Sequence, residues 1–108
     1  MGKKTDPKII DFIAKARKKF NIQRAIFFGS RARGDFLKDS DYDIILVSPD
    51  FEGIFFTKRI SLMYRFWKHY PLDIEPICYT PKEFKVKSKE HGIVRQAIKE
   101  GIELVKNL

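Results

Sequence analysis

Cysteine is nearly absent from this chain, since Cys78 is the only one among 108 residues. A single cysteine cannot form an internal disulfide, which excludes a cystine-stapled secreted fold and suits a reducing compartment. Long apolar runs are missing too, because no stretch approaches the ~20 residues that cross a bilayer. The amino-terminal segment has no signal-peptide core. We therefore expect a cytoplasmic protein without a membrane segment.

Internal repeats, linkers and low-complexity tracts are also lacking. At 108 residues the chain has the length of one ordinary domain, so we expect a single domain over residues 1–108. Hydrophobic residues make up 44% of it, ten of them phenylalanine, and its charged residues are evenly mixed. This composition predicts a folded globule rather than a disordered chain.

Acidic residues are outnumbered, with 14 against 22 basic ones and a net charge of +8. A positive field of this size suits an anionic partner such as nucleic acid. However, the excess is spread over residues 3–20 and 81–91, and no recognised nucleic-acid-reading motif accompanies it. A solvated basic surface is the simpler interpretation, and nucleic acid is the less favoured partner.

Hydrophobic spacing and capping signals predict an α/β (α+β) fold, a small mixed sheet flanked by helices. Asp6 and Pro7 mark the start of the first helix. Residues 80–83, "TPKE", form a capping box that starts another. The predicted helices are 7–20, 57–70, one from 80 onward and 92–101, the predicted strands are 24–28, 41–47 and 72–79, and 102–105 is a short strand or a frayed end.

The predicted helix 57–70 has more apolar residues than one buried face requires. One stripe comprises Ile60, Met63, Tyr64 and Trp67, and a second comprises Leu62, Phe66 and Tyr70. The first is expected to cover the sheet. The second is either buried or part of a protein interface, and burial is favoured in so small a chain.

The stretch "FFGSRARGD" suits an anion. Gly29 follows a predicted strand and precedes a short turn of helix, where backbone amides point outward and attract phosphate oxygens. Ser30 can add a hydroxyl, and Arg31 and Arg33 can add charge, although their spacing directs them to different faces, so one at most need touch phosphate. The stretch is neither a Walker A loop nor a dinucleotide GxGxxG motif.

The following stretch, "SDYDIILV", suits a cation. Asp41 and Asp43 are two residues apart at the start of a strand, so both carboxylates leave the same face. Converging carboxylates repel one another unless a cation lies between them, and Mg²⁺ prefers such oxygen ligands. A third carboxylate is expected from Asp73 or Glu75, which share a face of the strand 72–79. Asp35 and Asp39 are interpreted as turn or capping residues.

Glycine-serine, ten residues, then two aspartates one residue apart resembles the signature of the DNA polymerase beta-like nucleotidyltransferase superfamily. The closest resemblance is to its minimal nucleotidyltransferase (MNT) branch. The motifs "AIFFGSRARGD", "SDYDIILV", "LDIEPICYTPKEF" and "GIVRQAIKEGIELV" fall in the family's order across nearly the whole chain. The resemblance implies a nucleotidyltransferase-like fold.

By this resemblance, Gly29 and Ser30 hold the triphosphate, while Asp41, Asp43 and either Asp73 or Glu75 bind two Mg²⁺ ions and carry catalysis. The implied reaction moves a nucleoside monophosphate, AMP from ATP, onto an acceptor hydroxyl. MNT proteins typically pair with HEPN ribonucleases as antitoxin and toxin and adenylylate a tyrosine of the HEPN partner. The chain is therefore expected to be such an antitoxin. The alternatives are an antitoxin that acts by contact alone and a transferase that modifies nucleic acid.

Overall fold

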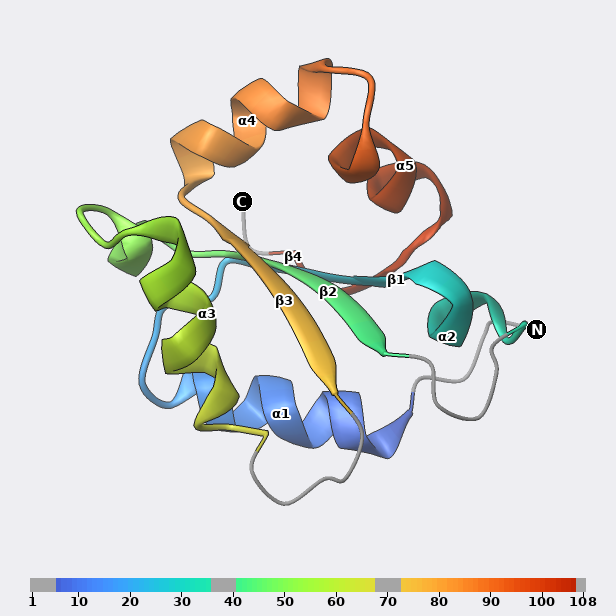
Figure 1. The fold of residues 1–108 in the computed structure, drawn as a ribbon, viewed down its shortest axis with the longest axis horizontal. Coiled ribbons are helices and arrows are strands. Elements are labelled where there is room, and N and C mark those ends of the chain that lie inside the picture. The colour runs from blue at the N-terminus through green and yellow to red at the C-terminus, as the bar shows by residue number, and fades with distance from the viewer. Residues whose placement is uncertain (1–5, 36–40, 68–72, 107–108) are drawn as a thin grey trace.

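The computed structural model describes residues 6–35, 41–67 and 73–106 (Figure 1). The elements follow in the order α1 (Pro7–Arg17), β1 (Arg24–Phe28), α2 (Gly29–Arg33), β2 (Tyr42–Val47), the 3₁₀ turn η1 (Pro49–Phe51), α3 (Phe56–Tyr64), β3 (Ile74–Tyr79), α4 (Pro81–Lys89), α5 (Ile93–Glu100) and β4 (Ile102–Lys106). None of the helices within these residues is long and apolar enough to cross a membrane.

The four strands form one mixed sheet in the order β3-β2-β1-β4. Strands β2 and β3 are parallel, whereas β1 is antiparallel to both β2 and β4. This confirms the predicted α/β class with a small mixed sheet. Residues 102–105 were predicted to be either a short strand or a frayed end. They form a strand, because residues 102–106 pair with β1.

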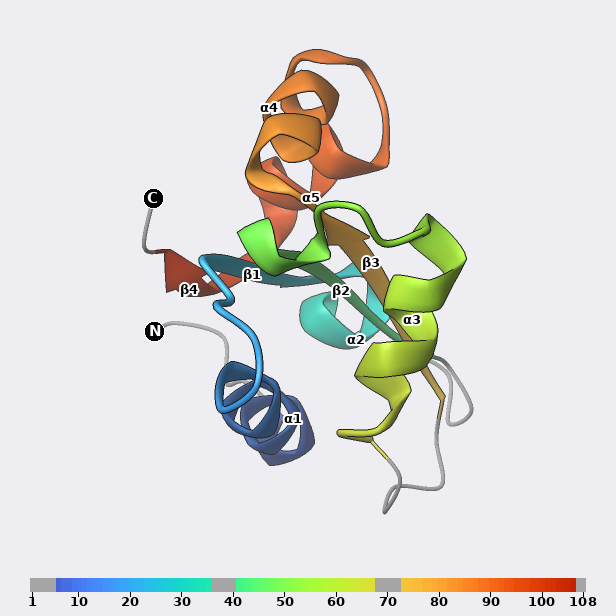
Figure 2. The same ribbon diagram turned by 90° about the vertical axis from the view of Figure 1, so that its left-hand side faces the viewer.

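Helices cover both faces of the sheet, with α1 and α3 on one side and α4 and α5 on the other (Figures 1 and 2). Side chains alternate between the two cores along each strand, as the pleat requires. In β1, Phe27 joins the core under α1 and α3, whereas Ile26 and Phe28 join the core under α4 and α5. Residues of β2 that lie on the same face of the strand as Asp43, such as Ile45, also face α4 and α5.

The first helix begins as predicted, since the Asp6 carboxylate accepts a hydrogen bond of 2.9 Å from the Lys8 amide and Pro7 occupies the first turn. It ends at Arg17, three residues short of the prediction. The chain turns there, and Phe20 packs on Phe51 with ring centroids 5.7 Å apart. Packing on η1 therefore overrides the helical spacing of residues 18–20.

Helix α3 ends at Tyr64 rather than continuing to residue 70, so the predicted first stripe is only partly right. Met63 and Trp67 are buried, but Tyr64, the last residue of the helix, is 46% exposed. Of the second stripe, Leu62 and Phe66 are partly buried against the core, and Tyr70 lies outside the described residues.

A buried arginine that the sequence analysis did not identify joins α3 to the opposite layer. Arg59 is only 5% exposed. Its guanidinium donates to the Ile54 carbonyl at 2.9 Å, the Cys78 carbonyl at 3.0 Å and the Glu83 carboxylate at 2.6 Å. Glu83 also completes the predicted capping box with Thr80. The same carboxylate thus caps α4 and neutralises Arg59.

Candidate active site

The predicted carboxylates gather where β2 and β3 begin. The parallel register sets Asp43 directly opposite Glu75. Side-chain interactions with both Asp41 and Asp43 shift the pKa of Glu75. The structure therefore joins three acidic side chains from two neighbouring strands on the sheet face that α4 and α5 cover.

The electrostatics of this cluster reflect its crowding. Burial raises the pKa of Asp43, and the charge of Asp41 raises it further, while a hydrogen bond from Glu75 opposes both effects. The hydrogen bond to Asp41, followed by burial and the charge of Asp43, raises the pKa of Glu75. The environment of the cluster thus favours the protonated forms of Asp43 and Glu75 more than water does.

Of the two candidates for the third carboxylate, the structure brings only Glu75 into contact with the pair. Asp73 precedes β3 and, like Glu75, is exposed. Its described role is structural, because its carbonyl accepts a hydrogen bond of 3.0 Å from the Tyr42 amide. Asp73 thus begins the pairing of β3 with β2.

Gly29 brings the main chain against these carboxylates. Its φ is +82°, in the region that favours glycine, and a Cβ at this position would overlap the Asp43 carboxylate. Gly29 opens α2, whose first turn contains Ser30 and has no side-chain cap. The predicted phosphate turn and the predicted cation site are therefore in direct contact.

The two arginines diverge, as their spacing predicted. Arg31 lies over the Tyr42 ring, with its guanidinium carbon 4.5 Å from the ring centroid. The Tyr42 hydroxyl in turn donates a hydrogen bond of 2.6 Å to Asp6. Arg33 is exposed and accompanies Gly29 at a cavity. Of the two, Arg33 is therefore the one placed to meet a ligand.

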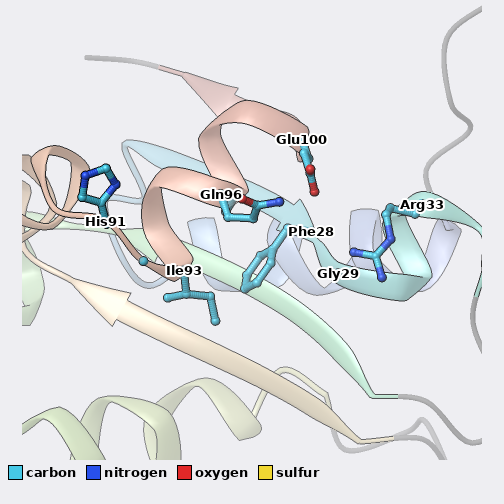
Figure 3. A pocket seen from close by; sticks show the side chains of 9 residues that line it. Phe28, Gly29, Arg33, His91, Ile93, Gln96 and Glu100 are labelled. Carbon is cyan, nitrogen blue, oxygen red and sulfur yellow. The ribbon is translucent and has the colours of Figure 1, made fainter.

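This cavity of about 600 Å³ lies between α2 and α5. Figure 3 shows Arg33 on α2, Gln96 and Glu100 on α5, and Phe28 between the two helices. Its lining comprises Phe28, Gly29, Arg33, His91, Gly92, Ile93, Gln96, Ala97 and Glu100. The α5 residues were missed by the sequence analysis, although the four-residue spacing of Gln96 and Glu100 places them on one helical face.

The remaining predicted residues lie away from the cluster. Asp35 accepts a hydrogen bond of 3.3 Å from Arg33 and is exposed, which agrees with a turn residue, and Asp39 lies outside the described residues. Cys78 is buried, as expected of a core residue, and burial raises its pKa to about 12. Of the two histidines expected on the surface, His91 is exposed and His69 lies outside the described residues.

The chemistry of the three carboxylates fits a hard divalent cation. In the described part of the chain, no three acidic, histidine or cysteine side chains already have the spacing to ligate one ion. Within the Asp41–Asp43–Glu75 cluster, the pKa values of Asp43 and Glu75 are instead raised by burial and by the neighbouring carboxyl groups. A bound cation would relieve the repulsion among these groups.

The chain belongs to the nucleotidyltransferase domain family, which it matches over residues 8–104. Its fold resembles that of a candidate nucleotidyltransferase from Sulfolobus solfataricus, with a TM-score of 0.59 and 22% identity, covering 95% of this chain and 90% of that one. It also resembles BolA1 from Arabidopsis thaliana, with a TM-score of 0.59 and 18% identity, covering 73% of this chain and 98% of that one.

At these low identities, the two structural likenesses establish the fold alone. No curated protein matches the chain significantly. The assignment to the family therefore comes from the domain match, and the candidate site gives it a location in this chain.

Proposed function

We propose that this protein transfers AMP from ATP to a hydroxyl of another macromolecule, a tyrosine of a HEPN-family partner, and acts as the antitoxin of that pair. One observation carries the chemical part: Gly29 presses against Asp43, which is paired in register with Glu75. A phosphate-binding turn and a carboxylate cluster in contact suit a nucleotide bound together with a divalent cation.

In the proposed reaction, the acceptor hydroxyl attacks the α-phosphorus of ATP. The new oxygen–phosphorus bond forms as the bond to pyrophosphate breaks, and the hydroxyl proton leaves to a carboxylate or to water. Asp41, Asp43 and Glu75 would hold Mg²⁺, which supplies charge neutralisation for the attacking and leaving oxygens when bound. The start of α2 would face the leaving phosphates, and Arg33 would add positive charge beside them.

The acceptor part of the proposal is supported by the resemblance of the motifs around Gly29, Asp41 and Asp43 to the MNT branch, whose members typically modify a tyrosine of a HEPN partner.

Labelled transfer tests this proposal. The protein is incubated with α-labelled ATP, Mg²⁺ and a HEPN protein, with total RNA as a second acceptor. We expect label in the HEPN protein, and its loss when the acceptor tyrosine is changed to phenylalanine. Label confined to RNA would favour the nucleic-acid-modifying alternative, which the net charge of +8 makes worth including. A stable complex without label would indicate neutralisation by contact.

A further inference from the structure

The cavity between α2 and α5 combines features that a triphosphate alone does not require. Arg33 supplies positive charge at one wall, next to Gly29. From the opposite wall Gln96 and Glu100 extend toward the space that Arg33 faces, as Figure 3 shows. Glu100 does not suit a phosphate group, because its carboxylate would repel it. Its presence indicates that the ligand brings a hydrogen-bond donor to this wall.

The floor of the cavity is apolar. Phe28 and Ile93 line it; Phe28 is only 7% exposed, so most of the accessible apolar surface belongs to Ile93, which is 52% exposed. A flat, largely apolar ring would cover this surface, whereas a triphosphate would gain nothing from it. Phe28 is also the β1 residue paired with Asp43, so a ring bound on it lies beside the carboxylate cluster.

Helix α5, which carries the hydrogen-bond acceptors Gln96 and Glu100, is held rigidly against the sheet. Val94 and Ala97 of α5 are buried in the core with Ile26 and Phe28. After α5, Gly101 lies so close to β1 that an added Cβ would be 2.6 Å from Ile26 Cγ2 and 3.0 Å from the Phe27 carbonyl oxygen. Gln96 and Glu100 therefore project from a fixed backbone, as a specificity site requires.

We propose that this cavity holds the nucleoside half of the nucleoside triphosphate, and that Gln96 and Glu100 select it by accepting hydrogen bonds from its donors. The inference rests on the proposed function and adds the residues that read the substrate. Arg33 then marks the phosphate end and the Phe28–Ile93 floor receives the base. The donors on a nucleoside are the ribose hydroxyls and the exocyclic amine of the base, and both would suit a carboxylate and an amide oxygen.

Calorimetric titration of the whole chain with three Mg²⁺-bound nucleotides separates these donors. ATP carries both, 2′,3′-dideoxy-ATP lacks the ribose hydroxyls, and purine riboside triphosphate lacks the amine. For the wild type we expect at least one analogue to bind about tenfold more weakly than ATP, since a hydrogen bond to a charged group is lost. Glu100→Gln should remove most of that difference, and Gln96→Ala should reduce it.

The matched control is Glu52→Gln, which removes an exposed carboxylate outside the cavity. This variant should retain the wild-type ratios of the affinity for ATP to the affinity for each analogue. If Glu100→Gln abolishes the difference in affinity between ATP and 2′,3′-dideoxy-ATP, Glu100 contacts the ribose. If it abolishes the difference between ATP and purine riboside triphosphate, Glu100 contacts the base. Nucleotide binding with ratios that neither cavity variant changes would overturn this inference and leave the proposed function standing. No binding of any nucleotide by the wild type would overturn both.

Discussion

At Gly29 two constraints coincide: a φ of +82° and contact with the Asp43 carboxylate. We expect Gly29→Ala to displace that carboxylate and to reduce transfer by about 100-fold, because small displacements of reacting groups are costly. Gly53→Ala is the matched control, since Gly53 has a similar φ of +78° but open space around it. Its backbone strain should lower the free energy of unfolding by about 1 kcal/mol with little effect on turnover. Equal turnover in the two variants would show that Gly29 has no role in the active site.

Glu75 and Asp73 provide a second matched pair, because both are acidic residues at the start of β3 but only Glu75 contacts Asp41 and Asp43. Glu75→Gln should lower turnover by about 100-fold or more, as expected for a group that acts at the reacting centre. Asp73→Asn should retain most activity, since the described hydrogen bond of Asp73 uses its backbone carbonyl. A larger loss in Asp73→Asn, in a protein with an unchanged circular dichroism spectrum, would make Asp73 the third carboxylate.

Asp43→Asn or Asp41→Asn should abolish transfer without unfolding the protein. Each substitution removes negative charge from a crowded cluster in which burial and the charge of Asp41 raise the pKa of Asp43, so stability should not fall. Labelled transfer measures the expected loss of activity, and thermal melting of the same preparation measures the expected retention of stability. Near-normal turnover with Mg²⁺ in either variant would show that the site is elsewhere.

At the scale of elements, the contact between Arg59 on α3 and Glu83 on α4 makes stability depend on pH. The hydrogen bond from Arg59 lowers the pKa of Glu83 in the folded protein. The stabilisation is therefore fully present above the unfolded value, near 4.5, and is lost as the pH falls through the folded pKa.

Glu83→Gln should remove this dependence while an amide retains the capping box. We expect it to lower the free energy of unfolding by about 1 kcal/mol at pH 7, a small effect because water screens the half-exposed carboxylate. The difference from wild type should shrink below about pH 4. Urea unfolding at a series of pH values measures this difference in the free energy of unfolding. Glu90→Gln, which removes the surface ion pair between Lys87 and Glu90, is the control. A constant difference at all pH values would contradict this explanation.

The end of α3 gives a prediction about packing. Phe66 is partly buried, and its ring centroid lies 6.2 Å from that of Phe20. We expect Phe66→Ala to lower the free energy of unfolding by about 2 kcal/mol, less than for a fully buried phenylalanine. The comparison is Phe55→Ala, whose side chain is 87% exposed and should change stability little. Unchanged stability with weaker partner binding would instead place Phe66 in an interface.

At the scale of the whole molecule, the sequence predicted what depends on local chemistry. Asp6 with Pro7 identified a helix start, Thr80 with Glu83 identified another, and the apolar run that follows Asp43 identified a strand. It could not choose between Asp73 and Glu75, because that contact depends on the register between β2 and β3. Arg59 and the α5 wall were missed for the same reason, since their partners are distant in sequence.

The identity of the transferred group distinguishes nucleotidyl transfer from phosphoryl transfer. Parallel reactions with α-labelled and γ-labelled ATP, each with Mg²⁺ and the acceptor protein, report which phosphorus remains bound. We expect α-label in the acceptor, γ-label released in pyrophosphate, and loss of transfer in Asp43→Asn and Glu75→Gln but not in Asp73→Asn. Transfer of γ-label to the acceptor, or α-label that persists in Asp43→Asn, would contradict nucleotidyl transfer at this site.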